Sequence, residues 1–364
     1  MLYDKFVKNL FEEAKKMERT IMSKEIEEQI NVLEKIEAKN QKVLEEIAKE
    51  VKLKNIKHTV LAGRGTSDHA CKYGVYMFGT FCNMVAGDAA ASIITLYDGK
   101  PNYNNDLVIG ISQSGKAADM NEILKQANES GAVTVAITND EDSLMAKTAK
   151  YHLFCNAEKE VSVAATKTFS AQLALIAYLT GYISGNEELL ENMRNVSKCL
   201  KETLDNSRKQ VELFGNKLKD ANDGFILARG YLYPIALETA LKIQETCYIK
   251  AKGYAVSDFY HGPLAQVDEN TPVVLFAGRG KAFKDSCDMI ERLQGIGNKP
   301  MVITNDTELS NKLENTVLIP DTGYEATSVF PYTLFIQSLA EYTSLSRGLN
   351  PDSPRALKKV TITK

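Results

Sequence analysis

Short apolar runs alternate with amphipathic stretches over most of the chain. HTVLAG, DLVIGIS, AVTVAIT and YHLFC, all between His58 and Cys155, have the length of strands and end in polar or glycine-bearing turns. The segment MNEILKQANESG has apolar residues at helical spacing and a glycine stop at Gly131. Strands that alternate with helices favour a parallel sheet covered on both faces, so the predicted fold class is α/β.

The same pattern returns in the second half of the chain. GFILARG matches VLAGRG, PVVLFAGRGKAF matches LVIGISQSGKAA, and VAITND returns as MVITND. The offset between matching residues stays within one position, as the pairs Lys116 and Lys281, and Glu160 and Glu325, illustrate. Self-similarity at a constant offset indicates an internal duplication. Two copies predict two pseudo-symmetric domains, each a parallel sheet flanked by helices, rather than a solenoid.

The start and end of this pattern divide the chain into four predicted parts. Residues 1–50 carry charges of both signs around apolar residues at helical spacing, and are predicted to form an N-terminal helical arm. Residues 51–200 and 201–350 are the predicted domains, and residues 351–364 are a basic C-terminal tail. The apolar positions of the arm, which we expect to pack on the body or on a partner subunit, are Met22, Ile26, Ile30, Leu33 and Ile36.

Composition and charge exclude several classes of protein. Apolar residues at 44% and charged residues at 25% are typical of a globular chain, and a net charge of -3 gives no sign of a nucleic-acid-binding face. The longest apolar stretch is too short to span a bilayer, and the charged N-terminus lacks the apolar core of a signal peptide. We therefore expect a cytoplasmic protein with no nucleic-acid and no membrane partner.

Six cysteines are scattered along the chain, with no CxxC pair and no histidine at metal-ligand spacing. This distribution is typical of buried, reduced thiols, and we expect neither a metal nor a cofactor. The six are Cys71, Cys82, Cys155, Cys199, Cys247 and Cys287.

The strongest chemical signal is the turn Ser112-Gln113-Ser114-Gly115-Lys116, between a predicted strand and a predicted helix. Hydroxyl and amide donors beside the free N–H groups of a helix N-terminus, together with a lysine, favour phosphate binding. The spacing is not that of a nucleotide P-loop. The alternative is that Ser114 only caps the helix, but the position at the carboxyl end of a parallel strand favours a ligand.

A second polar turn, GRGTS, follows the first predicted strand and ends at Ser67. It lacks the third glycine of a dinucleotide fingerprint, so a nicotinamide cofactor is not favoured. We expect this turn to line the same phosphate pocket, with Gly65 in the backbone and with Thr66 and Ser67 as hydroxyl donors. A structural role for Arg64 and a helix-capping role for His69 remain open.

A third set of residues lies in the predicted helix PIALETALKIQETC. Glu238, Lys242 and Glu245 are spaced at i, i+4 and i+7, which places them on one stripe among apolar neighbours. Charged groups on a buried helix are costly unless they are paired or functional, and an internal salt bridge between Glu238 and Lys242 is the alternative to function. His261 stands in a Gly-Pro turn, a position that favours function.

These segments together identify a family. On SQSG, VAATKTF, YPIALETALKIQE, YHGPLA and PRALKKVT, the chain from Met22 onward resembles the SIS (sugar isomerase) family. It is most similar to the isomerase half of glucosamine-fructose-6-phosphate aminotransferase and to stand-alone glucosamine-6-phosphate deaminases, the latter especially on GRGTSDHA. The resemblance implies two SIS domains, with the helical arm and the C-terminal tail completing the site.

The resemblance also implies catalytic roles. Glu245 would be the base that moves a proton between C1 and C2, and Glu238 and Lys242 would support it and shuttle protons. His261 would open the sugar ring from a neighbouring subunit, in a homodimer or a larger assembly. Lys359 would contact the open-chain sugar or form a Schiff base with it.

The implied partner is a small phosphosugar substrate, and the implied binding residues depart from the family at two positions. Ala117 stands where the aminotransferases have a threonine, and Ala165 where they have a serine. Lys116 would replace the missing hydroxyl with a point charge. The residues expected to bind the substrate are Gly65, Thr66, Ser67, Ser112, Gln113, Ser114, Lys116 and the backbone of Val163.

We expect the direction of the reaction to depend on whether a glutaminase domain is present. The aminotransferase needs a glutaminase domain with a cysteine at its mature N-terminus, and the chain starts at Met1 with no room for one. We therefore expect the hydrolytic reaction, in which glucosamine 6-phosphate and water give fructose 6-phosphate and ammonia. Ring opening, a 1,2-proton shift and imine hydrolysis need only general acid–base groups.

Two other kinds of function remain open. One is a deglycase for a fructosamine 6-phosphate, or a deaminase for another amino sugar phosphate, although deglycases of this kind lack the Leu-Lys-Lys ending found here. The other is a non-catalytic sugar-phosphate sensor, which needs the phosphate turn but not Glu245, His261 and Lys359 together.

Overall fold

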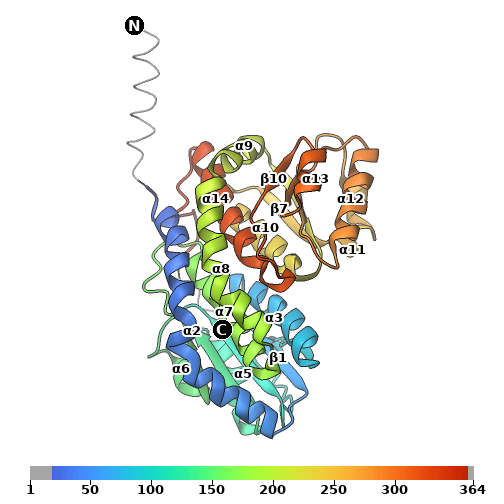
Figure 1. Cartoon of the computed structure of the whole chain (residues 1–364). Coiled ribbons are helices and arrows are strands. Elements are labelled where there is room, and N and C mark those ends of the chain that lie inside the picture. Colours follow the sequence, from blue (N-terminus) through green and yellow to red (C-terminus); the bar gives the residue numbers. More distant parts are fainter. Residues whose placement is uncertain (1–18, 360–364) are drawn as a thin grey trace.

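Two α/β units of the same design make up the body of the protein (Figure 1). The structure is a computed structural model, and it describes residues 19–359. The strands of the first sheet are β1 (His58–Ala62), β2 (Val85–Asp88), β3 (Leu107–Ser112), β4 (Val133–Thr138) and β5 (Tyr151–Phe154). Those of the second are β6 (Asp223–Ala228), β7 (Lys250–Ala255), β8 (Val273–Ala277), β9 (Met301–Thr304) and β10 (Thr316–Leu318).

The order of the strands confirms the predicted duplication. All pairs are parallel, and the two orders are β2-β1-β3-β4-β5 and β10-β9-β8-β6-β7. When β6 to β10 are matched with β1 to β5, the second order is the first one reversed, so the two sheets have one topology. The fold is therefore the predicted pair of α/β units.

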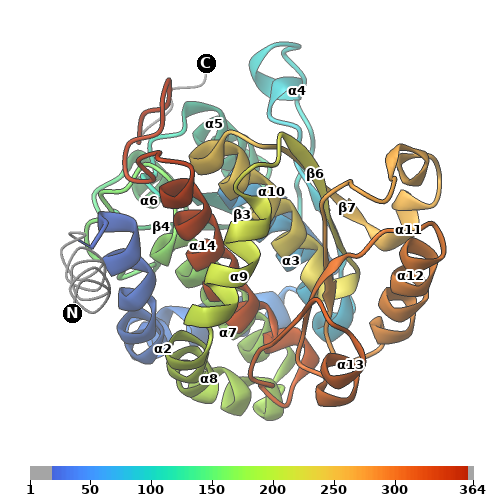
Figure 2. The same cartoon turned by 90° about the horizontal axis from the view of Figure 1, so that it is seen from above.

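A shared layer of helices separates the two sheets (Figure 2). One continuous core joins one face of each sheet to α3, α7, α10 and α14, while α5 covers the other face of the first sheet and α12 that of the second. The longer helices are α2 (Ile21–Leu53), α3 (Thr66–Cys82), α5 (Ala118–Glu129), α7 (Lys167–Ser184), α8 (Glu187–Asn206), α9 (Arg208–Leu218), α10 (Tyr233–Cys247), α12 (Phe283–Gly295) and α14 (Val329–Ser346). The short ones are α4 (Ser92–Thr95), α6 (Leu144–Thr148), α11 (Val256–Phe259) and α13 (Thr307–Lys312).

The helical arm is α2, which packs along α7 and α8. Its five predicted apolar positions are all buried, as the spacing requires. Residues 1–18 of the predicted arm lie outside the described residues, and the domain boundaries remain predictions. Between residues 19 and 359, no helix combines the length and the apolar character needed to cross a membrane.

The sequence pattern did not predict β2 or β7. Each is an edge strand with only one neighbour, and its side chains are largely exposed or half-buried. An edge strand does not need the apolar run that marks a strand buried on both faces, so no hydrophobic signal exists there.

The prediction that the cysteines are free is confirmed, whereas the prediction that they are buried is confirmed for three of them, because Cys82, Cys199 and Cys287 are half-buried. All six are free, and Cys71, Cys155 and Cys247 are buried. Burial raises the pKa of Cys247 to about 11 and that of Cys82 to about 12, so neither thiol is ionised at neutral pH.

Candidate active site

The two predicted phosphate turns lie side by side. Strands β1 and β3 are neighbours, paired from Thr59 with Leu107 to Ala62 with Gly110, and each turn follows the carboxyl end of its strand. The chain leaves β1 for β2 on one side and returns to β3 on the other, so the gap between the turns is the topological switch point of the sheet. Ligands of open α/β sheets bind at this point.

The turn after β3 keeps its serine hydroxyls close to the backbone. The N–H of Gly115 donates to Ser112 Oγ at 3.2 Å, and that of Lys116 to Ser114 Oγ at 3.3 Å. A serine oxygen that accepts a bond retains its own O–H for donation to a ligand anion. Helix α5 begins only at Ala118, after Ala117, so Ser114 does not cap it and the capping alternative is wrong. Gln113 is half-buried beside them.

The turn after β1 is tied to this one. Gly65 has a positive φ of 54°, which favours glycine, and α3 begins at the next residue. Ser67 is buried. Arg64 Nε lies 3.0 Å from Oδ2 of Asp119 in the first turn of α5, so this arginine links the turn after β1 to the helix that follows the turn after β3. This ion pair supports a structural role for Arg64.

The charged stripe on α10 forms one chain of ion pairs. Lys242 Nζ lies 2.5 Å from Glu245 Oε2 and 3.4 Å from Glu238 Oε1. The side chains of Glu238 and Lys242 are 0% and 1% exposed, whereas Glu245 is 23% exposed. Burial alone would lower the pKa of Lys242, but the carboxylates of Glu238 and Glu245 raise it above its ordinary value. Lys242 is therefore an ammonium, and Glu245 is the member of the chain that a ligand can reach.

Glu238 connects this helix to the first phosphate turn. Thr66 Oγ1 donates to Glu238 Oε1 at 3.1 Å, and His69 Nδ1 lies 2.7 Å from Glu238 Oε2. Thr66 and His69 both belong to the first turn of α3. The turn after β1 in the first unit and the charged helix α10 of the second therefore meet at one carboxylate.

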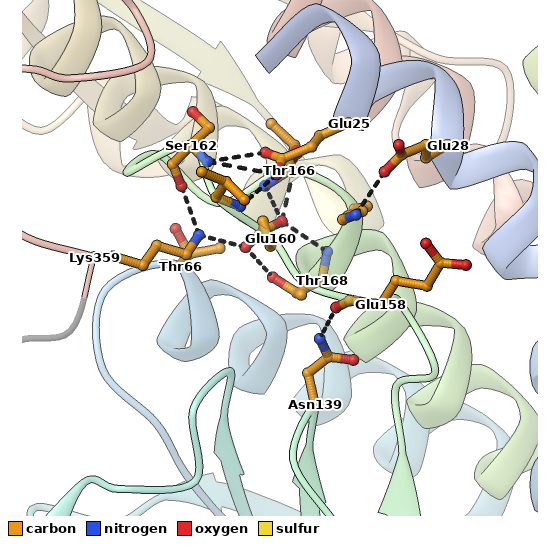
Figure 3. Close-up of polar contacts among 12 residues, drawn as sticks. Glu25, Glu28, Thr66, Asn139, Glu158, Glu160, Ser162, Thr166, Thr168 and Lys359 are labelled. Carbon is orange, nitrogen blue, oxygen red and sulfur yellow. Dashed lines mark hydrogen bonds and ion pairs between the residues drawn. The ribbon is translucent and has the colours of Figure 1, made fainter. Parts of the chain in front are cut away.

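Lys359 enters the site from the C-terminal tail (Figure 3). Its Nζ donates to Glu160 Oε2 at 2.6 Å and to the carbonyl of Ser162 at 2.7 Å. Burial would raise the pKa of Glu160, but Lys359 and the N–H groups of Thr166 and Thr168 hold it below its usual range. Glu238 and Glu245 contribute most to the raised pKa of Lys242, and the negative charge of Glu160 makes a smaller contribution. The tail and α10 therefore share one electrostatic environment.

The loop that carries Val163 is held from two sides. Glu25 of α2 accepts hydrogen bonds from the N–H groups of Val161 and Ser162. The N–H of Val163 donates to the carbonyl of Asp352 at 3.3 Å, and the Asp352 carboxylate accepts the first two N–H groups of α2 at 2.9 and 2.8 Å. The arm, the Val163 loop and the tail are therefore fastened to one another.

His261 lies apart from the other predicted residues. It is exposed in the turn after α11, and borders a cavity of about 290 Å³. This cavity is lined by Arg229, Val256, Ser257, Tyr260, His261, Asp285 and Asp288, none of which belongs to α10. His261 therefore takes no part in the ion pairs of α10 in its own subunit. A role for it in the site of a neighbouring subunit remains a prediction.

Sequence reasoning missed three residues that hold the site together. The sequence indicates Glu160 only as part of the repeat and His69 only as a possible helix cap, and no sequence pattern indicates a role for Glu25. Their importance comes from partners more than 100 positions away, and no local pattern contains those partners. The cap of α3 is Gly65, so the capping role for His69 is wrong.

Comparison with known proteins identifies the architecture. The SIS domain family model matches residues 52–180 and 217–340. Glutamine–fructose-6-phosphate aminotransferase of Aquifex aeolicus is 35% identical over 313 residues, which cover 85% of this chain and 52% of that protein. The chain spans about half the length of the curated relatives it matches.

Solved structures share the whole fold. The C-terminal domain of glucosamine-fructose-6-phosphate aminotransferase from Francisella tularensis is similar with a TM-score of 0.83 at 25% identity, covering 93% of this chain and 99% of that one. Glucosamine-6-phosphate deaminase from Thermotoga maritima has the same fold with a TM-score of 0.73 at 20% identity, covering 94% of this chain and 100% of that one.

Proposed function

The chain belongs to the SIS domain family, and we propose that it is an isomerising deaminase that converts glucosamine 6-phosphate and water into fructose 6-phosphate and ammonia. The observation that carries the proposal is the buried ion-pair chain of α10. It ends at a partly exposed carboxylate, Glu245, and begins at Glu238, which accepts a hydrogen bond from Thr66 of a phosphate turn.

The phosphate of the substrate would lie at the switch point between β1 and β3. Ser67, Ser112 and Ser114 supply hydroxyl donors there, Gln113 an amide and Lys116 a charge. The sugar would then extend toward Glu245, with the Val163 backbone and Lys359 on its other side. Binding the phosphate fixes the sugar carbons relative to the base, which is the main contribution of such remote contacts.

The proposed chemistry is a sequence of proton transfers. His261 of a neighbouring subunit would open the ring to the aldehyde. Glu245 would take the proton from C2 and return it to C1, which converts the 2-amino aldehyde into a 2-imine with a C1 hydroxyl group. Water then adds to C2, and ammonia leaves as the C2 carbonyl forms. The ammonium of Lys242, 2.5 Å from Glu245 Oε2, would hold the Glu245 side chain in place for this transfer.

Lys359 would act at the carbonyl end of the open-chain sugar. It is held by Glu160 and by the carbonyl of Ser162, so its nitrogen has a fixed position next to the Val163 loop. A positioned ammonium there can polarise the C1 oxygen, and a deprotonated amine can form a Schiff base with the sugar.

The sequence similarity to aminotransferases favours a second candidate. The same residues would catalyse the reverse isomerisation, from fructose 6-phosphate and ammonia to glucosamine 6-phosphate, in a protein that receives ammonia from glutamine. The two candidate functions would use the same site and differ in the source of nitrogen. Assays with different substrates can therefore distinguish them, whereas the geometry of the site cannot.

A substrate panel tests the proposal. The purified protein is incubated with glucosamine 6-phosphate, galactosamine 6-phosphate or a fructosamine 6-phosphate, and released ammonia is measured. In parallel it receives fructose 6-phosphate with glutamine or with ammonium, and formation of glucosamine 6-phosphate is measured. We expect ammonia from glucosamine 6-phosphate, whereas glutamine-dependent synthesis would favour the second candidate. Binding of the sugar phosphates without turnover would indicate a sensor.

A further inference from the structure

His69 occupies a position that the proposed chemistry leaves without a role. It lies in the first turn of α3, two residues after Ser67, and its side chain is 14% exposed. Its Nδ1 is 2.7 Å from Oε2 of Glu238, whose side chain is fully buried. We expect the Nδ1 of His69 to be the donor in this contact, because an ionised carboxylate can only accept hydrogen bonds.

The contacts of Glu238 show what His69 controls. One carboxylate oxygen, Oε1, faces both Thr66 Oγ1 at 3.1 Å and Lys242 Nζ at 3.4 Å, and the other, Oε2, faces His69. The lysine is nearer to Glu245, at 2.5 Å, than to Glu238. While His69 forms a hydrogen bond with Glu238 Oε2, the ammonium of Lys242 can stay against Glu245.

Loss of His69 would change this balance. A buried carboxylate that loses a hydrogen-bond donor is strongly destabilised, and it compensates by moving toward another donor or by taking up a proton. If Glu238 turns toward Lys242, the ammonium moves away from Glu245. If Glu238 takes up a proton, the charge that Lys242 shares between two carboxylates acts on Glu245 alone. Either response changes the proton transfer, whereas the hydrogen bonds of Ser112 and Ser114 in the turn after β3 do not involve Glu238.

We propose that His69 is a positioning residue of the acid–base chain: it holds Glu238 so that Lys242 stays against Glu245. The residue acts through Glu238 and not on the substrate. The inference deepens the proposed function and rests on it. It also assigns a purpose to the contact between the two units, because α3 carries the phosphate turn of one unit and α10 the base of the other.

The test compares three substitutions in the intact protein. His69→Ala removes the donor, His69→Asn places an amide nitrogen near the position of Nδ1, and His58→Ala is the control. His58 also faces a carboxylate, Asp106, at 3.3 Å, but it stands at the exposed start of β1. For each protein, kcat and KM of ammonia release and the binding of glucosamine 6-phosphate are measured.

We expect His69→Ala to lower kcat roughly 10- to 100-fold while KM and substrate binding change by less than about threefold. His69→Asn should recover most of the lost kcat, and His58→Ala should match the unaltered protein. Unchanged turnover in His69→Ala, or a loss confined to substrate binding, would overturn the inference. If the alanine variant does not fold, His69→Gln replaces it, since its amide nitrogen lies near the position of Nε2 rather than Nδ1.

A measurement that needs no turnover separates this inference from the proposed function. Nitrogen-15 NMR of the histidine side chains, with His69 assigned from the asparagine variant, reports which ring nitrogen carries a proton. We expect a protonated Nδ1 at neutral pH, and an unprotonated Nδ1 would overturn the inference. If the unaltered protein releases no ammonia but His69 shows this proton, the proposed function fails while the contact with Glu238 stands.

Discussion

Glu238, Lys242 and Glu245 bring two negative charges and one positive charge into the interior at a single helix. Burying ions costs free energy, and replacing a buried ion pair with apolar residues is often neutral or stabilising. The stripe is therefore poorly explained by stability alone. The three side chains carry one excess negative charge, and this excess is removed when Glu245 accepts a proton. Such a charge balance suits a base that takes a proton from a sugar carbon.

The first prediction concerns Glu245. Glu245→Gln keeps the size of the side chain and cannot accept a proton, so ammonia release should fall by on the order of 10²–10⁴, or about 3 to 5 kcal/mol of transition-state stabilisation. Substrate binding and the fold should survive, because a neutral amide is no costlier to bury than a carboxylate. The check is exchange of the C2 proton with solvent deuterium, and exchange at the native rate would make Glu245 a structural partner only.

The second prediction concerns the phosphate turn. Ser112→Ala combined with Lys116→Ala should raise KM much more than it lowers kcat, at least about 10-fold against less than about threefold, since phosphate contacts act equally on the ground and transition states. Unphosphorylated glucosamine should be a very poor substrate of the unaltered protein. Comparable steady-state turnover of glucosamine and its 6-phosphate would show that the turn has another purpose.

At the scale of elements, α2 is fastened at both ends to parts that serve the site. Asp352 of the tail accepts the N–H groups at its start, and Glu25 in its second turn holds the Val163 loop. Near its end, Glu50 accepts hydrogen bonds from Lys150 Nζ at 2.7 Å and Tyr151 Oη at 2.6 Å, at the start of β5. The loop of Glu160 and Val163 follows β5, so α2 braces this loop through Glu25 and the start of the strand before it through Glu50.

The third prediction tests this brace through pH. Burial opposes ionisation of Glu50, but hydrogen bonds from Lys150, Tyr151 and Lys54 lower its pKa to about 2 from an ordinary value of 4.5. A depressed pKa stabilises the fold fully above about pH 4.5, and this contribution is lost as the pH falls toward 2. Glu50→Gln should therefore reduce the free energy of unfolding by about 1 kcal/mol at pH 7 and by less at pH 3.

Urea unfolding at the two pH values measures this difference. Glu46→Gln is the matched control, because Glu46 lies on the same helix, half exposed and 4.0 Å from Lys42. An equal loss for Glu50→Gln at both pH values, or an equal loss in the two variants, would contradict the role of Glu50.

Features that depend on residues close together in the sequence could be predicted, and contacts between residues far apart in the sequence could not. The helix of Glu238, Lys242 and Glu245 was predictable because its members are three and four positions apart on one face. The polar turns after β1 and β3 were predictable as turns because a turn after a buried strand is a local pattern, and phosphate binding by them stays a prediction. The anchoring of Lys359 by Glu160 was not, since 199 positions separate them and only the fold brings the tail to that loop.

At the scale of the whole molecule, the duplicated units have diverged at their turns. In the second copy, Gly280 and Lys281 correspond to Gly115 and Lys116, and the N–H of Lys281 donates to Glu325 Oε2 at 3.1 Å. The Glu325 carboxyl group fills the space beside Gly280 where a side chain would lie. In the first copy the matching glutamate, Glu160, is bound by Lys359 instead. An acidic side chain thus occupies the second turn, while the first keeps its serine donors.

The fourth prediction concerns assembly. If His261 completes the site of a neighbouring subunit, the protein is at least a dimer. Inactive His261→Ala mixed with inactive Glu245→Gln should then regain activity, up to about half of the native value per hybrid dimer, because each hybrid contains one intact site. Activity assays after subunit exchange measure the recovery. A fully active monomer in solution would contradict it.

The central claim is that the α10 chain moves a proton between C2 and C1 of an amino sugar phosphate and so releases its nitrogen. The most direct measurement follows glucosamine 6-phosphate with the unaltered protein in deuterium oxide, by ammonia assay and by NMR of the sugar carbons. We predict equal amounts of ammonia and fructose 6-phosphate, with deuterium at C1 of the product to the extent that Glu245 exchanges its proton with solvent before returning it. Product without ammonia, or no change at C2 in a substrate that demonstrably binds, would contradict the account.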